Sequence, residues 1–261
     1  MDLTTLSGDD TPDRVRSLCA QARNPIPESL ANALSIPPEL QRTAAVCVYH
    51  HFLEVARRAL EGSGIPVAVV AAGFPAGLSP LRQRIDEVQA SATAGADEID
   101  AVINRSHVLT GEWEALYDEV RSFREAAGAA RLKIILATGE LRTLANVARA
   151  SRLCMLAGAD FIKTSTGKEA VNATYPAGLV MLRAIRDHFD RTGQQVGFKP
   201  AGGIRTPSQA LEWLRLTRDV PGEGWSGPER FRLGASSLLD EIVGRLELYR
   251  EGREEREEEI T

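Results

Sequence analysis

The sequence predicts a single-domain α/β protein built as a (β/α)8 barrel. Eight short runs rich in apolar and β-branched residues recur along the chain, with helical patterns between them. The runs are almost continuously apolar, as expected for parallel strands that are covered on both faces. The length of 261 residues also matches the roughly 250 that such a barrel requires. An open, doubly wound sheet is the main alternative, but no composition shift or long linker divides the chain, and we therefore favour one barrel.

The individual elements can be read in order from their composition and their start signals. The predicted strands are residues 3–6, 44–49, 66–72, 98–104, 132–138, 160–165, 196–200 and 230–236. The proline-bearing stretch 24–40 is expected to form a long first connection that contains a short helix. Helix starts are indicated where a hydroxyl residue, which can cap the first turn, precedes a proline: Thr11-Pro12, Ser79-Pro80 and Thr206-Pro207. Thr206 and Gln209 also match a capping box.

The barrel is expected to occupy residues 1–250, followed by an acidic tail at 251–261. The tail carries six Glu and two Arg and accounts for most of the formal charge of −5. The nearly neutral remainder offers no basic surface for nucleic acid and no polybasic patch for a membrane. The longest apolar run, near 65–75, is too short to span a bilayer. We therefore expect small-molecule partners, no nucleic acid and no membrane, and a homodimer is compatible with the sequence.

The cysteines and histidines indicate neither disulfides nor metal. Cys19, Cys47 and Cys154 are odd in number, and their spacing matches no zinc or redox motif. The first residues contain no basic region followed by an apolar stretch, as a signal peptide would require. The adjacent His50 and His51 have no carboxylate at ligand spacing, so no metal site is expected. We therefore expect a cytoplasmic protein with reduced thiols.

Two lysines end neighbouring predicted strands. Catalytic groups in a barrel of this kind lie at the carboxyl ends of the strands and in the loops that follow. Lys163 directly follows the apolar residues that begin "FIKTSTGK", and Lys199 is near the end of the predicted strand in "VGFKP". Two ammonium groups in one apolar interior are costly unless compensated, so they predict a functional site. Asp100, on the fourth strand, can face them, whereas Lys133 lies nearer the start of its strand and is not included.

This trio favours nucleophilic chemistry. A lysine with the usual pKa of ~10.4 is protonated at neutral pH and reacts poorly, but burial and a neighbouring cation lower its pKa. The free amine can then form a Schiff base with a carbonyl and act as an electron sink for making or breaking a C–C bond. Asp100 could relay protons, directly or through one water. In the alternative interpretation both lysines extend to solvent and pair with acids.

Three glycine-containing loops follow the last three predicted strands: "TSTGK" (164–168), "AGGIR" (201–205) and "GASS" (234–237). Glycine lets backbone amides approach an anion closely, and Ser236 and Ser237 can open a helix whose N-terminus attracts phosphate. Barrels of this class often hold phosphate in the loops after strands 7 and 8. With charge from Lys168 and Arg205, the loops predict a phosphorylated substrate. The run is not a P-loop, because Glu169 stands where Ser or Thr is required.

Eight segments, in order from residue 2 to about 245, carry a family resemblance: "DLTTL", "AAVCVY", "GADEIDAVIN", "LKIILATGEL", "GADFIKTSTGK", "VNAT", "GFKPAGGIRT" and "FRLGASSLL". Together they resemble the 2-deoxyribose-5-phosphate aldolase family. The resemblance implies a class I aldolase, without metal or other cofactor, that interconverts 2-deoxy-D-ribose 5-phosphate with D-glyceraldehyde 3-phosphate and acetaldehyde. A different phosphosugar enzyme on the same scaffold, such as an isomerase or synthase, and a non-catalytic phosphosugar-binding protein are the alternatives.

The resemblance also assigns roles that spacing left open. It implies that Lys163 forms the Schiff base, that Lys199 activates it, and that Asp100 transfers protons. Asp2 would hold Lys199 in place. The implied phosphate contacts are Gly167, Lys168, Gly202, Gly203, Arg205, Gly234, Ser236 and Ser237.

Thr4 and Cys47 are supporting candidates. Thr4 is a polar residue of the first strand. Cys47 is expected to be a small core residue whose thiol meets aldehydes only if it faces the barrel mouth. The chain departs from the family pattern where a helix usually precedes the first strand, so Asp2 is expected to fray, and His50 stands where many members have proline. It also lacks the usual tail tyrosine, since its last tyrosine is Tyr249.

Overall fold

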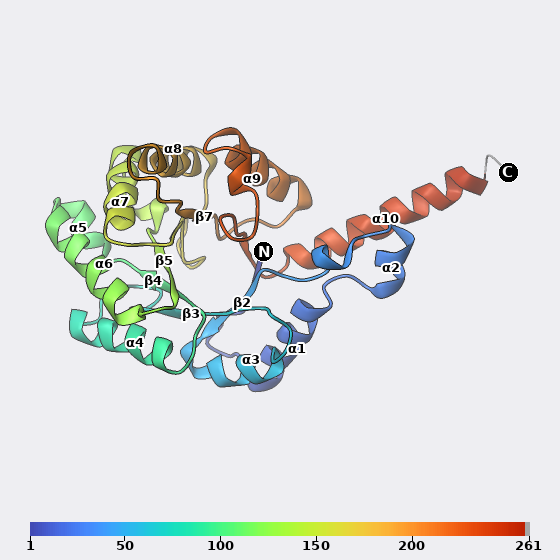
Figure 1. Cartoon of the computed structure of the whole chain (residues 1–261), viewed down its shortest axis with the longest axis horizontal. Coiled ribbons are helices and arrows are strands. Elements are labelled where there is room, and N and C mark those ends of the chain that lie inside the picture. The colour runs from blue at the N-terminus through green and yellow to red at the C-terminus, as the bar shows by residue number, and fades with distance from the viewer. Residues whose placement is uncertain (259–261) are drawn as a thin grey trace.

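Eight parallel strands form one sheet in the order β7-β6-β5-β4-β3-β2-β1-β8, with helices around its outside (Figure 1). The computed structural model describes residues 1–258. Isolated bridges from Phe198 to Phe231 and from Ala201 to Gly234 join β7 to the β8 edge and complete the barrel. The predicted (β/α)8 barrel is therefore confirmed.

The strands are short and the helices longer. The strands are β1 (Asp2–Thr4), β2 (Ala45–Tyr49), β3 (Val67–Ala71), β4 (Glu98–Val102), β5 (Arg131–Ile135), β6 (Phe161–Lys163), β7 (Gly197–Lys199) and β8 (Gly234–Ala235). The α-helices are α1 (Pro12–Arg23), α2 (Glu28–Ala33), α3 (Leu53–Ala59), α4 (Leu81–Thr93), α5 (Arg105–Thr110), α6 (Trp113–Ala127), α7 (Leu144–Leu156), α8 (Tyr175–Thr192), α9 (Pro207–Asp219) and α10 (Leu238–Glu258). The 3-10 turns are η1 (Pro38–Leu40), η2 (His50–Phe52), η3 (Thr138–Glu140) and η4 (Glu223–Trp225).

Two of the three predicted helix starts are confirmed. The Thr11 hydroxyl accepts the Arg14 N–H at the start of α1, and Thr206 and Gln209 form a capping box at α9. The Ser79 prediction is wrong. Pro80 itself takes the cap position of α4, because its carbonyl accepts the N–H of Arg84, and no side chain caps this helix. A cap was therefore predicted one residue too early.

The last helix leaves the barrel. In Figure 1, α10 projects away from the strands and passes α2, which it contacts. It runs to Glu258 without interruption across the predicted boundary at residue 250. The division into a barrel and an acidic tail stays a prediction, and residues 259–261 lie outside the described part of the chain. Within residues 1–258, no helix combines the length and apolarity needed to cross a membrane.

Packing between β6 and β7 inside the barrel supports the strand positions that carry the two lysines. Phe161 on β6 is paired in register with Gly197 on β7, and a Cβ added at Gly197 would lie 2.3 Å from the Phe161 ring. The aromatic ring therefore needs a glycine opposite it. Two residues further along the same two strands, and therefore on the same face of the sheet, come Lys163 and Lys199.

We expect Gly197→Ala to lower the free energy of unfolding by about 1–3 kcal/mol, because the added methyl overlaps the Phe161 ring. Gly244→Ala is the matched control. No atom lies within 4 Å of a Cβ built on Gly244 in α10. Alanine there should be neutral or stabilising by up to about 1 kcal/mol. Urea denaturation of both variants tests this, and equal stability of the two would contradict the packing argument.

Candidate active site

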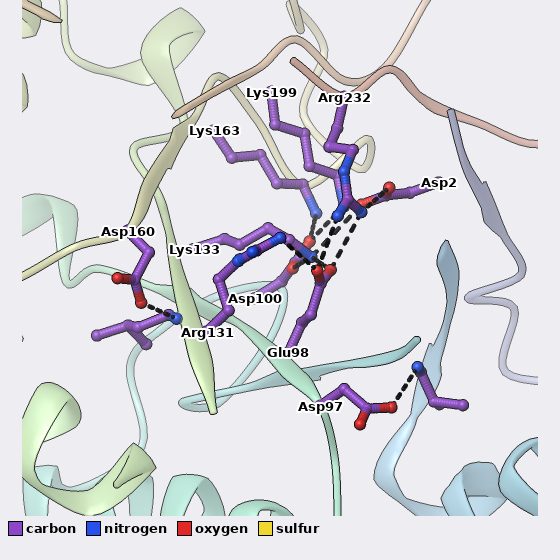
Figure 2. A network of polar contacts seen from close by, with 12 residues as sticks. Asp2, Asp97, Glu98, Asp100, Arg131, Lys133, Asp160, Lys163, Lys199 and Arg232 are labelled. Atoms are coloured by element: carbon purple, nitrogen blue, oxygen red, sulfur yellow. Dashed lines mark hydrogen bonds and ion pairs between the residues drawn. The ribbon is translucent and has the colours of Figure 1, made fainter. Parts of the chain in front are cut away.

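Lys163 and Lys199 face the same interior. They are partners in the β6–β7 ladder, so their side chains leave adjacent strands on the same side of the sheet. Lys163 is 3 % exposed and Lys199 is fully buried. Figure 2 shows both side chains pointing toward a group of carboxylates in the barrel. The prediction that the two lysine side chains enter the same interior from neighbouring strands is therefore confirmed.

Asp100 on β4 joins the two lysines. One of its oxygens, Oδ2, accepts from Lys163 Nζ at 2.7 Å and from Lys199 Nζ at 2.8 Å. Its other oxygen, Oδ1, accepts from Lys133 Nζ at 2.8 Å. The pKa of Asp100 lies well below its usual range because, although burial opposes its charge, the three lysines outweigh that effect. This carboxylate is therefore ionised when the cavity is empty of substrate.

Asp2 lies on β1 and is fully buried, so the expectation that it frays is wrong. It accepts from Lys199 Nζ at 2.5 Å and from Arg232 Nη1 at 2.7 Å. These contacts place Asp2 where it can hold Lys199, as the family resemblance implied. The same cations keep its pKa well below the usual value against the opposing effect of burial.

Three further charged residues belong to this group and were not predicted. Lys133 lies 2.5 Å from Glu98, and Arg232 pairs with the same Glu98 at 2.9 Å. We call these three residues together with Asp2, Asp100, Lys163 and Lys199 the interior charge cluster (Figure 2). A signal was present in the sequence, because Glu98 and Asp100 are two apart on one strand and so share a face. Setting Lys133 aside was wrong, since the register pairs it with Asp100 despite its place near the strand start.

The interior charge cluster has four basic and three acidic side chains. Lys133 contacts three carboxylates and Lys199 contacts two, whereas Lys163 contacts Asp100 alone. Burying one excess charge is unfavourable, so the least compensated base should be the one to lose its proton. Burial, with the added effect of Lys199, lowers the pKa of Lys163 despite Asp100. Burial acts the same way on Lys199, but Asp100 and Asp2 together outweigh it and raise its pKa.

Thr4 and Cys47 lie beside the cluster. Thr4 borders the cavity that contains Lys163, and its hydroxyl donates to the backbone carbonyl of Asp2, two residues earlier, at 2.9 Å. Cys47 is fully buried and packs with Leu6 and Val70, and burial raises the pKa of its thiol. Its expected place in the core is confirmed. A supporting role for either residue stays a prediction.

A cavity of about 290 Å³ opens at the carboxyl ends of the strands, with Lys163 in its wall. All eight residues predicted to bind phosphate line it: Gly167, Lys168, Gly202, Gly203, Arg205, Gly234, Ser236 and Ser237. A larger cavity of about 550 Å³ is lined by residues from the opposite strand ends, among them Asp97 and Arg131, and by neither Lys163 nor Lys199. The smaller cavity is therefore the candidate site, since it alone of the two joins a buried amine of lowered pKa to the glycine-containing loops and to the cations Lys168 and Arg205.

The composition of the site sets its chemistry. All four lysines of the chain are here, three in the interior charge cluster and Lys168 at the cavity. Among the described residues, no group of three or more His, Cys, Asp or Glu side chains could hold a metal ion. An amine of lowered pKa, a bridging carboxylate and a second ammonium can add to a carbonyl and move protons around the adduct.

Comparisons with known proteins agree with this geometry. The family model described as DeoC/LacD family aldolase matches residues 1–219. The deoxyribose-phosphate aldolase of Homo sapiens is 56% identical over 255 residues, which cover 97% of this chain and 80% of the human protein. The putative deoxyribose-phosphate aldolase of Caenorhabditis elegans is 46% identical over 245 residues, covering 93% and 78% of the two chains.

Solved structures share the fold. The putative deoxyribose-phosphate aldolase of Coccidioides immitis superposes with a TM-score of 0.75 at 28% identity and covers 92% of this chain and 83% of its own. The deoxyribose phosphate aldolase of Aeropyrum pernix, described as tetrameric, has a TM-score of 0.67 at 24% identity, with 94% and 88% covered. At that identity the second likeness supports the fold alone.

We expect Lys133→Met to raise the pKa of Lys163, because it removes a cation and leaves Asp100 less neutralised. Only the free amine reacts, so the reactivity of Lys163 rises with pH up to its pKa, and a lowered pKa places that rise below ~10.4. Reductive methylation followed by peptide mass mapping should show the rise at higher pH in the variant. Arg152→Met, which removes an exposed cation that pairs with Asp187 outside the cluster, is the control and should leave the profile nearly unchanged. An unmoved profile in Lys133→Met would contradict the charge-balance argument.

Proposed function

The chain belongs to the DeoC/LacD family of aldolases, and we propose on this premise that it is a deoxyribose-phosphate aldolase. The reaction is the reversible cleavage of 2-deoxy-D-ribose 5-phosphate to D-glyceraldehyde 3-phosphate and acetaldehyde. The observation that carries the proposal is that Lys163 has a lowered pKa and stands in the wall of a cavity lined by glycine-containing loops and by Lys168 and Arg205. An amine nucleophile and a phosphate site in one cavity suit an aldehyde that carries a phosphate.

The proposed reaction begins with the amine of Lys163. It adds to the C1 aldehyde of the open-chain sugar, and loss of water gives a protonated imine. The products contain two and three carbons, so the bond that breaks is C2–C3. The C3 hydroxyl gives up its proton as C3 becomes the aldehyde of glyceraldehyde 3-phosphate, and the electron pair of the broken bond moves toward the imine nitrogen. Protonation of the resulting enamine at C2, followed by addition of water, releases acetaldehyde and restores Lys163.

Asp100 and Lys199 are proposed to manage the protons of these steps. Asp100 Oδ2 lies within hydrogen-bond distance of both Lys163 and Lys199, so a proton leaving one nitrogen has an acceptor beside it. Asp2 and Asp100 keep Lys199 charged, and that charge opposes protonation of Lys163. Once Lys163 has become an iminium, Asp100 stabilises the new positive charge.

The phosphate is proposed to bind at the rim of the cavity. Lys168 and Arg205 supply positive charge, and both residues are exposed there. Glycines follow β6 and β7, where a backbone turn with positive φ lets the chain pass close to an anion; Gly203 has φ +81°. Ser236 and Ser237 immediately precede α10, whose N-terminus favours negative charge. The sugar phosphate would therefore stay near solvent while its aldehyde reaches inward to Lys163.

Partners, oligomeric state and location are assigned in less detail than the reaction. The proposed partners are small phosphosugar and aldehyde substrates. A homodimer is compatible with the sequence and is not tested by the structure, and light scattering would distinguish it from a tetramer like that described for Aeropyrum pernix. The expected cytoplasmic location also stays a prediction, with support from three buried cysteines that form no disulfide.

Incubation with acetaldehyde and borohydride should leave an added ethyl group on Lys163, because reduction fixes the imine to that amine. Lys163→Met should abolish both the label at this position and cleavage of 2-deoxyribose 5-phosphate, with a loss of at least about 1,000-fold. Peptide mass mapping and a retro-aldol assay provide the measurements. Modification of Lys199 alone, or full activity in Lys163→Met, would overturn the assignment. If the protein binds phosphosugars but borohydride leaves no adduct on any lysine, an isomerase, a synthase or a binding protein would be favoured.

We expect Lys168→Met to reduce kcat/KM for 2-deoxyribose 5-phosphate by about 10- to 100-fold, because it removes a charge-assisted contact to the phosphate. Cleavage of unphosphorylated 2-deoxyribose should change little. Arg183→Met, which removes an exposed cation on α8, is the matched control and should leave both substrates unaffected. An equal loss with both substrates would show that Lys168 does not recognise the phosphate.

A further inference from the structure

Three consecutive backbone amides in the loop after β6 are already occupied within the protein. The N–H of Thr166 donates to both carboxylate oxygens of Glu169 at 3.1 Å, and the N–H of Gly167 donates to Glu169 Oε2 at 3.1 Å. The N–H of Lys168 donates to the Thr166 hydroxyl at 3.1 Å. An N–H that is bonded inside the protein is not available to a phosphate. This loop therefore offers the cavity a charged side chain rather than a set of backbone donors.

Glu169 lies behind this loop rather than in the cavity. Its side chain is 2 % exposed. Thr166, Gly167 and Lys168 all line the cavity of about 290 Å³, whereas Glu169 does not. A buried carboxylate is costly unless hydrogen bonds or charges compensate it, and here the loop amides do so. The carboxylate and the loop thus fix each other's position.

Arg105 holds Glu169 from the other side. Its guanidinium lies 3.5 Å from Glu169 Oε1 and 2.7 Å from Glu140, and it donates to the Pro75 carbonyl at 3.0 Å. Arg105 opens α5 after β4, while its partners follow β3, β5 and β6. One guanidinium therefore connects the four successive loops that follow β3, β4, β5 and β6. Glu169 is its contact in the last of these loops.

We propose that Glu169 is a positioning residue for phosphate recognition, which fixes the 164–168 loop so that the ammonium group of Lys168 faces the cavity. The backbone donors to the phosphate then come from the loops after β7 and β8, where Gly203, Ser236 and Ser237 line the same cavity. Gly167 contributes its small size and its backbone turn at φ +88° rather than its N–H. The inference deepens the proposed function and rests on it for the identity of the substrate.

The first test compares 2-deoxyribose 5-phosphate with unphosphorylated 2-deoxyribose. Glu169→Gln keeps the size of the side chain but turns one terminal atom into a donor, which must then face the loop amides or Arg105. The ratio of kcat/KM between the two substrates should fall about tenfold, while borohydride trapping of acetaldehyde on Lys163 stays at the wild-type level. Glu212→Gln is the matched control, since it removes an exposed carboxylate that bonds Tyr175, and it should leave the ratio unchanged.

A double-mutant cycle tests whether Glu169 acts through Lys168. In a Lys168→Met background, Glu169→Gln should lower the ratio by less than about twofold, because the group that it positions is gone. The same tenfold loss in both backgrounds would overturn the inference. Arg105→Met removes the clamp but leaves the carboxylate on the amides. It should shift the ratio in the same direction by a smaller amount, which supplies a second variant if Glu169→Gln does not fold.

Calorimetric titration with inorganic phosphate separates this inference from the proposed function. Phosphate should bind about tenfold more weakly to Glu169→Gln than to the wild type and to Glu212→Gln. If the wild type cleaves neither sugar but this loss of phosphate affinity appears, the proposed function fails and the inference stands. If cleavage is normal and neither the substrate ratio nor the phosphate affinity changes, the inference fails and the function stands.

Discussion

Charge balance around one buried carboxylate governs the site. Asp100 contacts Lys133, Lys163 and Lys199, and the interior charge cluster still has one more base than acid. The other bases are fixed by additional carboxylates, so the proton deficit falls on Lys163. No single contact activates that lysine. Its lowered pKa follows from burial and from the way acids and bases are distributed over six strands or strand edges, which explains why so many charged groups lie inside an otherwise apolar barrel.

The fold supplies this arrangement through register and through ties between loops. Parallel pairing sets Lys163 level with Lys199 and Asp100 level with Lys133. The loops beyond the strands are held by buried arginines. Arg84, for example, donates to the carbonyls of Ala72 and Val102 at 2.9 and 2.7 Å. The strands can therefore be only two to five residues long, because the ends that carry the chemistry are braced by side chains.

The sequence was most informative where one residue carries its own signal. Continuous apolar runs predicted the barrel, lysines at strand ends predicted the buried lysine pair, and glycines after late strands predicted the cavity lining. What it could not supply was register between strands distant in the chain. Lys133 was set aside by its place along β5, yet what matters is the residue opposite it on β4. Arg232 was missed for the same reason, since its partners Asp2 and Glu98 are far away in sequence.

The concentration of lysine in one place also affects the rest of the surface. Elsewhere the chain uses arginine for positive charge, and a guanidinium does not condense with aldehydes as an amine does. Lys168 is the one lysine that is exposed in the described chain. In the presence of acetaldehyde, the surface would thus expose few lysine amines that could form unwanted adducts. For the same reason, the one lysine that amine-directed cross-linkers and resins can reach is Lys168, at the mouth of the candidate cavity.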